Sequence, residues 1–281
     1  MKAKKENAAI RFLYHTIAGR SLLRLLVSPG VSKACGAVLD SRASVALIPL
    51  FQRKNGISME GVEIPKGGFP SFNAFFSRKR VCKSVETNVD LSSPCDSFLT
   101  CIQIHKDQIF DVKHTRFGLQ DLLQDAALAN EFSDGVALVF RLTPAHYHRY
   151  AYAVDGKILC WRKIKGVLHS VRPICTRQFP VYVQNAREYQ VIETEHLGKI
   201  VQMEIGALLI GRITNECPKD RKSIRGREKG KFEFGGSTIL LLLQKDAVRL
   251  RSDILATMDG KDELSVSYGE TLVQTSAEQL S

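Results

Sequence analysis

Apolar residues recur at helical spacing in the first part of the chain. Ile10, Leu13 and Ile17 share one helical face, which predicts a first helix that stops at Gly19. Ser21 is expected to cap a second apolar segment. These segments would either pack on the rest of the protein or lie on anionic lipid, and the two interpretations are compatible.

A second helical region is expected over residues 32–60, and a connector that contains Pro and Gly follows over residues 61–70. Residues 71–80 then place three phenylalanines before three cations. One interpretation of this segment is a membrane-facing patch. The other, which we favour, is a helix buried by its aromatic side with its basic end in solvent.

After residue 90 the pattern changes to short apolar runs that are typical of β-strands. The expected strands cover residues 91–96, 98–104, 109–112, 136–142, 151–154, 158–164, 189–193, 200–205 and 207–213. One helix is expected in this part, over residues 119–130. The sequence therefore predicts an α+β fold in two parts, a basic helical region over residues 1–80 and a β-rich domain over residues 81–281.

Charge is distributed unevenly between these two parts. The whole chain has a net charge of +11, and residues 1–80 hold 14 Lys and Arg against 4 Asp and Glu. This excess implies an anionic partner, either nucleic acid or a membrane surface. Nucleic-acid binding would need aromatic residues interleaved with cations, whereas the aromatic residues here lie in apolar stripes. We therefore expect an anionic membrane surface and no nucleic acid.

Other features of the sequence limit the compartment and the cofactors. No stretch reaches the roughly 20 apolar residues that a spanning helix needs. Cations such as Arg11 and Arg20 interrupt any signal-peptide core. The seven cysteines are scattered and form no C-x-x-C, which favours a reduced compartment and argues against a bound metal.

The candidate chemistry centres on Gly235-Gly236-Ser237, which leads directly into an apolar run. Two glycines between strands usually form a plain hairpin turn. A serine that follows glycine can also attack the preceding carbonyl, because glycine tolerates the backbone twist that this attack requires. Attack by the Ser237 hydroxyl on Gly236 would give an ester. Elimination and hydrolysis would then cut the chain and leave a pyruvoyl group at position 237.

Three further stretches contain groups suited to such chemistry. Asp96 follows a proline turn, where aspartate most often caps its own backbone. His146 and His148 would face the same side of a strand, where we expect acid–base work in preference to metal binding. Residues 169–173 contain a histidine and an arginine, and form either a loop or a carboxylate-binding site.

Taken in order, these stretches resemble the phosphatidylserine decarboxylase family, whose members are pyruvoyl enzymes. The segments that carry the resemblance are Ser71-Phe72-Asn73-Ala74-Phe75-Phe76, Ser93-Pro94-Cys95-Asp96, Tyr147-His148-Arg149, Val201 to Gly211 and Phe234-Gly235-Gly236-Ser237-Thr238. The resemblance implies self-cleavage between Gly236 and Ser237 into a large chain, 1–236, and a small chain, 237–281. It further implies a covalent pyruvoyl cofactor made from Ser237 and no metal.

By the same resemblance, Asp96 and Ser237 belong to the relay that cleaves the chain, and His148 protonates the substrate carbon after CO₂ leaves. The implied substrate is phosphatidylserine and the product phosphatidylethanolamine. The implied setting is the cytoplasmic face of a membrane, to which the protein binds peripherally, and processed protomers are expected to form a homodimer.

Two positions depart from the family pattern. Many relatives carry a second histidine three positions after His148, where this chain has Ala151, and Ser97 replaces a usual glycine. His148 or His146 would then replace the missing relay histidine. The alternative is an uncleaved, catalytically impaired relative that binds anionic membrane.

Overall fold

The computed structural model describes residues 12–13, 16–81, 89–105, 109–112, 115–169, 181–207, 212–216, 218–233, 237–258 and 262–274. Helices form the first part of this chain and a large antiparallel sheet organises the rest, so the α+β prediction is confirmed. Gly235 and Gly236 of the expected cleavage turn lie outside the described residues, whereas Ser237 lies within them.

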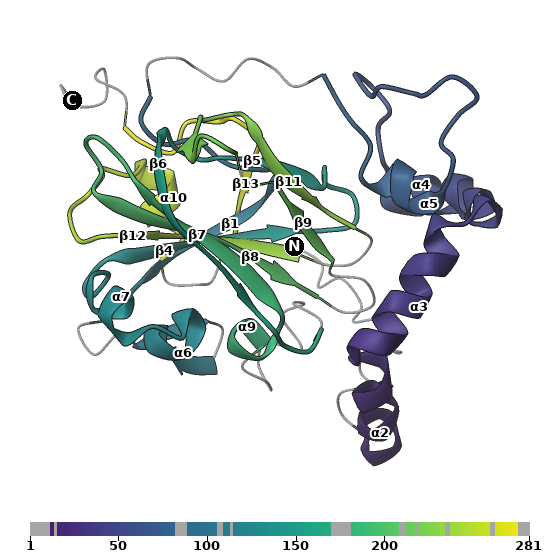
Figure 1. The fold of residues 1–281 in the computed structure, drawn as a ribbon, viewed down its shortest axis with the longest axis horizontal. Helices are drawn as coiled ribbons and strands as arrows, with labels where there is room; N and C mark the ends of the chain where they lie inside the picture. The colour runs from purple at the N-terminus through teal and green to yellow at the C-terminus, as the bar shows by residue number, and fades with distance from the viewer. Residues whose placement is uncertain are drawn as a thin grey trace.

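Five short helices are described in the N-terminal part, and Figure 1 shows them at one side of the β-rich body, with α2 and α3 extending as an arm. They are α2 (Ile17–Leu26), α3 (Pro29–Asp40), the 3-10 helix η1 (Arg42–Leu47), α4 (Ile48–Asn55) and α5 (Phe72–Phe76). Ser28 caps α3 by accepting a hydrogen bond from the Val31 backbone N–H, and Pro29 occupies the first turn.

The prediction that a helix stops at Gly19 is wrong, because Gly19 and Ser21 both lie inside α2. A Cβ atom at Gly19 would lie 2.0 Å from the Phe12 carbonyl oxygen, so this glycine permits close backbone packing. The helical prediction for residues 32–60 is confirmed, although Ser41 separates α3 from η1.

Among the described residues, no single helix has the length and apolar character to cross a membrane. One bent pair, Ala34–Asp40 with Arg42–Asn55 at 79°, passes that test only when its two helices are taken together.

The body contains an eight-stranded sheet in the order β10-β6-β7-β8-β12-β4-β1-β13, and every neighbouring pair is antiparallel. Its strands are β1 (Ser97–Gln103), β4 (Val136–Leu142), β6 (Gly156–Ile164), β7 (Arg187–Glu193), β8 (Lys199–Gly206), β10 (Lys222–Ser223), β12 (Ser237–Leu243) and β13 (Leu264–Val266). All seven residues of β12 are buried, because β12 lies inside the sheet and both faces of the sheet are covered.

Each face of this sheet has its own apolar core. On one face, Tyr150 and Phe232 from a second sheet, and Tyr152 directly after it, pack with Ile239 and Leu241. This second sheet has the order β5-β11-β9, with β5 (Arg149–Ala151), β9 (Ile213–Asn215) and β11 (Glu228–Phe232). On the other face, shown with its helices in Figure 1, the core is covered by α6 (Leu119–Leu123), α7 (Ala126–Asn130) and α9 (Val181–Gln184). The remaining elements are the hairpin β2 (Ile109–Val112) and β3 (Thr115–Gly118) and the helix α10 (Ser252–Leu255).

Three expectations for the β-rich part need correction. Residues 119–130 form two helices, because Gln124 takes a left-handed conformation with φ 50° and Asp125 caps the second helix. Residues 91–96 form no named strand and contribute only the isolated bridge between Ser92 and Thr271. Residues 200–205 lie in β8, which pairs with β7 and β12, whereas most of the expected partner strand, 207–213, lies outside the described residues.

Candidate active site

Ser237 begins β12 between two strands that end beside it. Its register partners are Leu142, the last residue of β4, and Gly206, the last residue of β8. The residue is fully buried, and among the described residues its hydroxyl oxygen has no hydrogen-bond partner. A buried hydroxyl without a partner costs about 1–3 kcal/mol. The hydroxyls of Ser97 and Thr238 share this state, so what distinguishes Ser237 is its place directly after two glycines.

His148 lies at the same end of the sheet, after the turn that follows β4. Its backbone carbonyl accepts a hydrogen bond of 2.9 Å from the Phe232 N–H, which ties it to the strand that leads toward Ser237. The predicted strand placement of His146 and His148 is wrong, because β5 begins at Arg149. The two histidines instead lie in an irregular segment, where the His146 Nδ1 accepts a hydrogen bond from the Thr143 N–H.

The hydrogen bonds of His148 determine where its proton sits. Its Nδ1 lies 2.9 Å from the His146 carbonyl oxygen, which can only accept, so Nδ1 carries the hydrogen. Complete burial lowers the pKa of His148 to about 3, and the nearby Arg78 charge also lowers it, against the hydrogen bond to His146. The ring is therefore neutral at neutral pH, and its unprotonated Nε2 is buried without a partner among the described residues.

Asp96 binds an arginine. Its carboxylate accepts hydrogen bonds of 2.9 and 3.2 Å from Arg80, and Oδ1 also accepts one of 2.8 Å from the Tyr268 N–H. The structure thus brings Ser237 and His148 to one end of the sheet but does not connect Asp96, His148 and Ser237 by hydrogen bonds. The roles expected for these three residues stay predictions.

Ala151 occupies a closed position in β5. It is buried, its N–H donates to the Pro94 carbonyl oxygen at 2.9 Å, and its own carbonyl oxygen accepts from Gln202. Position 151, where many relatives carry histidine, therefore lies next to the Pro94-Cys95-Asp96 segment. The backbone N–H and carbonyl of Ala151 are both hydrogen-bonded there.

Residues 71–80 form one wall of the site. Phe72, Phe75 and Phe76 are buried, and the Phe76 ring centroid lies 3.9 Å from that of His148, which supports the interpretation of a buried aromatic side. The expectation that the basic end is solvated is wrong for Arg78, which is 5% exposed. The Ser77 carbonyl oxygen accepts a hydrogen bond from Arg149, so this segment is fixed against β5.

Asn185 supports the opposite side of Ser237. Its side chain donates to the carbonyl oxygens of His169 and Gly206 at 2.8 and 2.7 Å and accepts from the His169 N–H. Gly206 is the register partner of Ser237, so Asn185 connects His169 to this end of β8. The expected site at residues 169–173 is otherwise outside the described residues.

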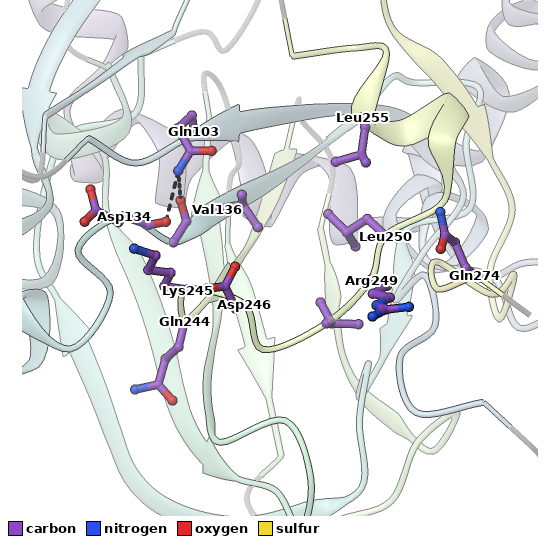
Figure 2. Close-up of a pocket in the computed structure, with 12 residues that line it drawn as sticks. Gln103, Asp134, Val136, Gln244, Lys245, Asp246, Arg249, Leu250, Leu255 and Gln274 are labelled. Atoms are coloured by element: carbon purple, nitrogen blue, oxygen red, sulfur yellow. Dashed lines mark hydrogen bonds between the residues drawn. The ribbon is translucent and has the colours of Figure 1, made fainter. Parts of the chain in front are cut away.

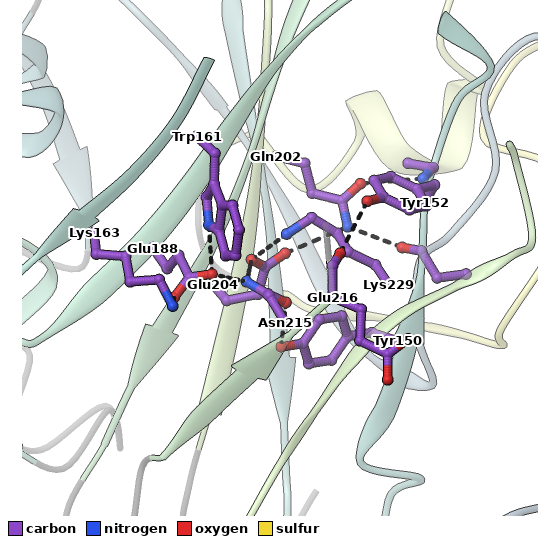
Figure 3. A network of polar contacts seen from close by, with 12 residues as sticks. Tyr150, Tyr152, Trp161, Lys163, Glu188, Gln202, Glu204, Asn215, Glu216 and Lys229 are labelled. Carbon is purple, nitrogen blue, oxygen red and sulfur yellow. Dashed lines mark hydrogen bonds and ion pairs between the residues drawn. The ribbon is translucent and has the colours of Figure 1, made fainter. Parts of the chain in front are cut away.

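A buried polar network, shown in Figure 3, joins the two sheets next to this site. Lys229 of β11 and Glu204 of β8 form an ion pair of 2.5 Å in which both side chains are fully buried. Asn215 of β9 donates to Glu204 and to Glu188 of β7 and accepts from the Tyr150 hydroxyl. The network therefore connects strands of the small sheet to neighbouring strands of the large sheet.

Burial dominates the electrostatics of this network. It raises the pKa of Glu204, while Lys229 and Asn215 act in the opposite direction by stabilising the carboxylate. Gly230 follows Lys229 at a very close approach, because a Cβ atom there would lie 2.4 Å from the Thr214 carbonyl oxygen and 2.6 Å from the Asn215 side-chain oxygen.

A cavity of about 450 Å³ lies at the far end of β12 and is shown in Figure 2. Its lining includes Gln103, Val136 and Gln244, and Val136 pairs with Leu243, the last residue of β12. Seven strand residues, roughly 20 Å, separate this end from Ser237. The cavity is therefore not the place of the expected chemistry. Among the described residues no cluster of three or more His, Cys, Asp or Glu is placed to hold a metal ion.

Comparisons with known proteins agree with this arrangement. The family model described as phosphatidylserine decarboxylase matches residues 72–274. Phosphatidylserine decarboxylase proenzyme 2 of Clostridium acetobutylicum is 36% identical over 274 residues, which cover 96% of this chain and 93% of the relative. The phosphatidylserine decarboxylase proenzyme of Ruminiclostridium cellulolyticum is 36% identical over 268 residues, which cover 92% of this chain and 89% of the relative.

These relatives and the extent of the match show that the chain is an enzyme, a decarboxylase of the carboxy-lyase type. The chain belongs to the phosphatidylserine decarboxylase family.

Sequence reasoning missed the polar network and Arg78. The spacing of Gln202 and Glu204 within the apolar strand 200–205 was an available signal, because alternate polar residues in such a strand indicate one polar row on a buried face. No comparable signal marked Lys229, whose partner lies 25 residues away in the chain.

We expect Glu204→Gln to lower the free energy of unfolding by about 3–5 kcal/mol, because it leaves the Lys229 ammonium buried without a counter-charge. Urea unfolding in an uncleaved Ser237→Ala background measures this. The double variant Glu204→Met/Lys229→Met should lose much less, and equal losses in single and double variants would contradict the buried pairing.

We expect the free energy of unfolding to fall as the pH is lowered, because His148 is buried in its neutral form. Its folded pKa of about 3 lies below the unfolded value of 6.5, so its contribution is complete above pH 6.5 and is lost as pH falls toward 3. At pH 5 the loss amounts to roughly 2 kcal/mol. In the Ser237→Ala background, His148→Gln should remove this part of the pH dependence, whereas His196→Gln, at an exposed histidine, should leave it intact.

Proposed function

We propose that the chain cleaves itself between Gly236 and Ser237 and then converts phosphatidylserine to phosphatidylethanolamine and CO₂ with the resulting pyruvoyl group. The observation that carries this proposal is the buried, unpartnered hydroxyl of Ser237 at the start of an interior strand, directly after two glycines. The names of the relatives, which are called proenzymes, support it.

Cleavage begins at the Ser237 hydroxyl. Its oxygen adds to the Gly236 carbonyl carbon as a base removes the proton, and the C–N bond then breaks to give an ester and a free amine. Loss of the Cα proton expels the Gly236 carboxylate and leaves dehydroalanine. Its tautomer, an imine, takes up water and releases ammonia, which leaves the ketone at position 237.

His148 is the base that the geometry favours, since its neutral Nε2 has a free lone pair at the same end of the sheet as Ser237. The apolar surroundings of that nitrogen, with the Phe76 ring 3.9 Å away between centroids, exclude water from it. Ala151 contains no group that can take this proton.

In the decarboxylation, the pyruvoyl group supplies an electron sink for the pair left behind when CO₂ departs. His148 would then deliver a proton to the substrate carbon. Because burial lowers the pKa of His148 to about 3, its protonated form is scarce at neutral pH, so a proton must first reach Nε2 before this delivery.

The substrate is a membrane lipid, and the helical part fits a peripheral membrane surface. Val38, Leu47 and Leu50 are exposed there by 66, 47 and 65%, among the excess cations of residues 1–80. Exposed apolar side chains would enter the lipid while cations attract its anionic headgroups. The four described cysteines are free thiols, which fits the cytoplasmic face.

We expect intact-mass spectrometry of the purified protein to give two chains, 1–236 and 237–281, and a ketone at residue 237. Under native conditions the chains should elute together, because β12 of the small chain pairs on both sides with strands of the large chain. Ser237→Ala should remain one chain without decarboxylase activity.

A single unbroken wild-type chain would instead support the uncleaved, membrane-binding relative that Ala151 allows. In that case Ala151→His would be the variant to examine for restored cleavage.

We expect Val38→Glu/Leu50→Glu to reduce binding to phosphatidylserine-containing vesicles about tenfold or more, since two apolar side chains worth 1.4 kcal/mol or more together leave the lipid. Vesicle co-sedimentation measures this. Ile224→Glu, at a position of the β-rich body that is 48% exposed, is the control and should bind normally. Equal binding of the wild type and all variants would contradict the proposed contact of Val38 and Leu50 with the lipid.

A further inference from the structure

Arg78 is a buried cation beside the candidate active site. Arg78 is 5% exposed, and its guanidinium carbon lies 5.3 Å from the centroid of the Phe75 ring. Its one hydrogen bond among the described residues is a long one, 3.4 Å from Nη1 to the Phe75 carbonyl oxygen. Most of its five N–H donors therefore have no protein acceptor in the part of the chain that the structure describes.

The nearby negative charge is already in use. Asp96 accepts two hydrogen bonds from Arg80 and one from the Tyr268 N–H. No ion pair to Arg78 is formed within the described residues. Burial lowers the pKa of Arg78, and the charge of Arg80 lowers it further. Arg80 occupies the Asp96 carboxylate, so Arg78 has no ion-pair partner among the described residues, and burial of an unpaired charge is costly.

Arg78 is also fixed relative to the groups expected to react. Phe76, two residues before it, packs against the His148 ring in a tilted arrangement. Ser77, immediately before it, accepts a hydrogen bond from Arg149 of β5. The charge of Arg78 is close enough to His148 to lower the pKa of that histidine. The backbone that carries Arg78 is therefore held in place on the wall of the site, and the guanidinium lies over the Phe75 ring.

We propose that Arg78 binds the phosphodiester of the substrate headgroup. A guanidinium matches two phosphate oxygens with parallel hydrogen bonds, and a substrate anion would supply the missing counter-charge. This inference rests on the proposed function, because it assigns a subsite for the lipid substrate named there.

The phosphodiester fits this role better than the carboxylate of the same substrate. The carboxylate loses its charge as CO₂ departs, so a guanidinium bound to it would stabilise the ground state more than the transition state and slow the reaction. The phosphodiester keeps its charge throughout. Arg78 would then contribute equally to binding before and during reaction, and its loss should appear in KM and not in kcat.

The test compares Arg78→Gln with Lys79→Gln, which removes the same charge from the adjacent, exposed position. With a water-soluble short-chain phosphatidylserine, Arg78→Gln should raise KM about tenfold or more while kcat changes little. Lys79→Gln should match the wild type. A fall in kcat at unchanged KM would overturn the proposal, because it would place Arg78 on the reacting carboxylate or in the proton transfer.

Direct binding separates this inference from the proposed function. Calorimetry with uncleaved Ser237→Ala protein should detect glycerophosphoethanolamine, a phosphodiester without a carboxylate, and Arg78→Gln should weaken it about tenfold. Unchanged affinity would overturn the subsite even if the wild type is an active decarboxylase. Equal affinity for inorganic phosphate would also overturn it, by making Arg78 a general anion site.

Arg78→Lys guards against misfolding of the glutamine variant, since it keeps the charge and the packed stem. Its KM should lie between those of the wild type and Arg78→Gln, because lysine lacks the paired donors. A KM equal to that of the wild type would contradict recognition by the guanidinium.

Discussion

The contact on which the rest of the structure depends is the ion pair between Lys229 and Glu204. Neither side chain has exposed surface, and the two belong to different sheets. Backbone hydrogen bonds fix each sheet internally but leave the spacing between the layers to side chains. A buried charged pair resists sliding, because any displacement separates opposite charges in a medium of low dielectric constant. Its position therefore sets where β11 ends relative to where β12 begins.

The two ends of the expected cleavage segment are held by unlike means. Phe232 is tied to His148, and Ser237 is tied to β4 and β8. The described residues on either side of Gly235 and Gly236 are therefore both fixed by backbone hydrogen bonds or strand pairing. The proposed self-cleavage requires such fixed flanks together with the backbone freedom that glycine provides.

The fold class could be predicted from the sequence because helical spacing before residue 80 and short apolar runs after residue 90 differ clearly. The assignment of Ser237 and His148 to the catalytic residues followed from the family resemblance, and neither periodicity nor spacing contains it. The break at Gln124 and the interior place of Gly19 were missed, since both depend on local contacts that only the folded chain has. The burial of Arg78 was missed for a related reason: a run of three cations is typical of a surface, and only packing against Phe75 distinguishes its first member.

The interior place of β12 has a consequence for the order of events in the life of the protein. If the bond before Ser237 is broken, the interior strand β12 belongs to a separate chain of 45 residues. From the unfolded state, that chain can join the sheet only by a bimolecular encounter. Assembly of the sheet then has to precede scission. A processed molecule that unfolds would have lost the covalent tether that guided its first folding, so its lifetime is governed by how slowly it opens and hardly by how well it can re-form.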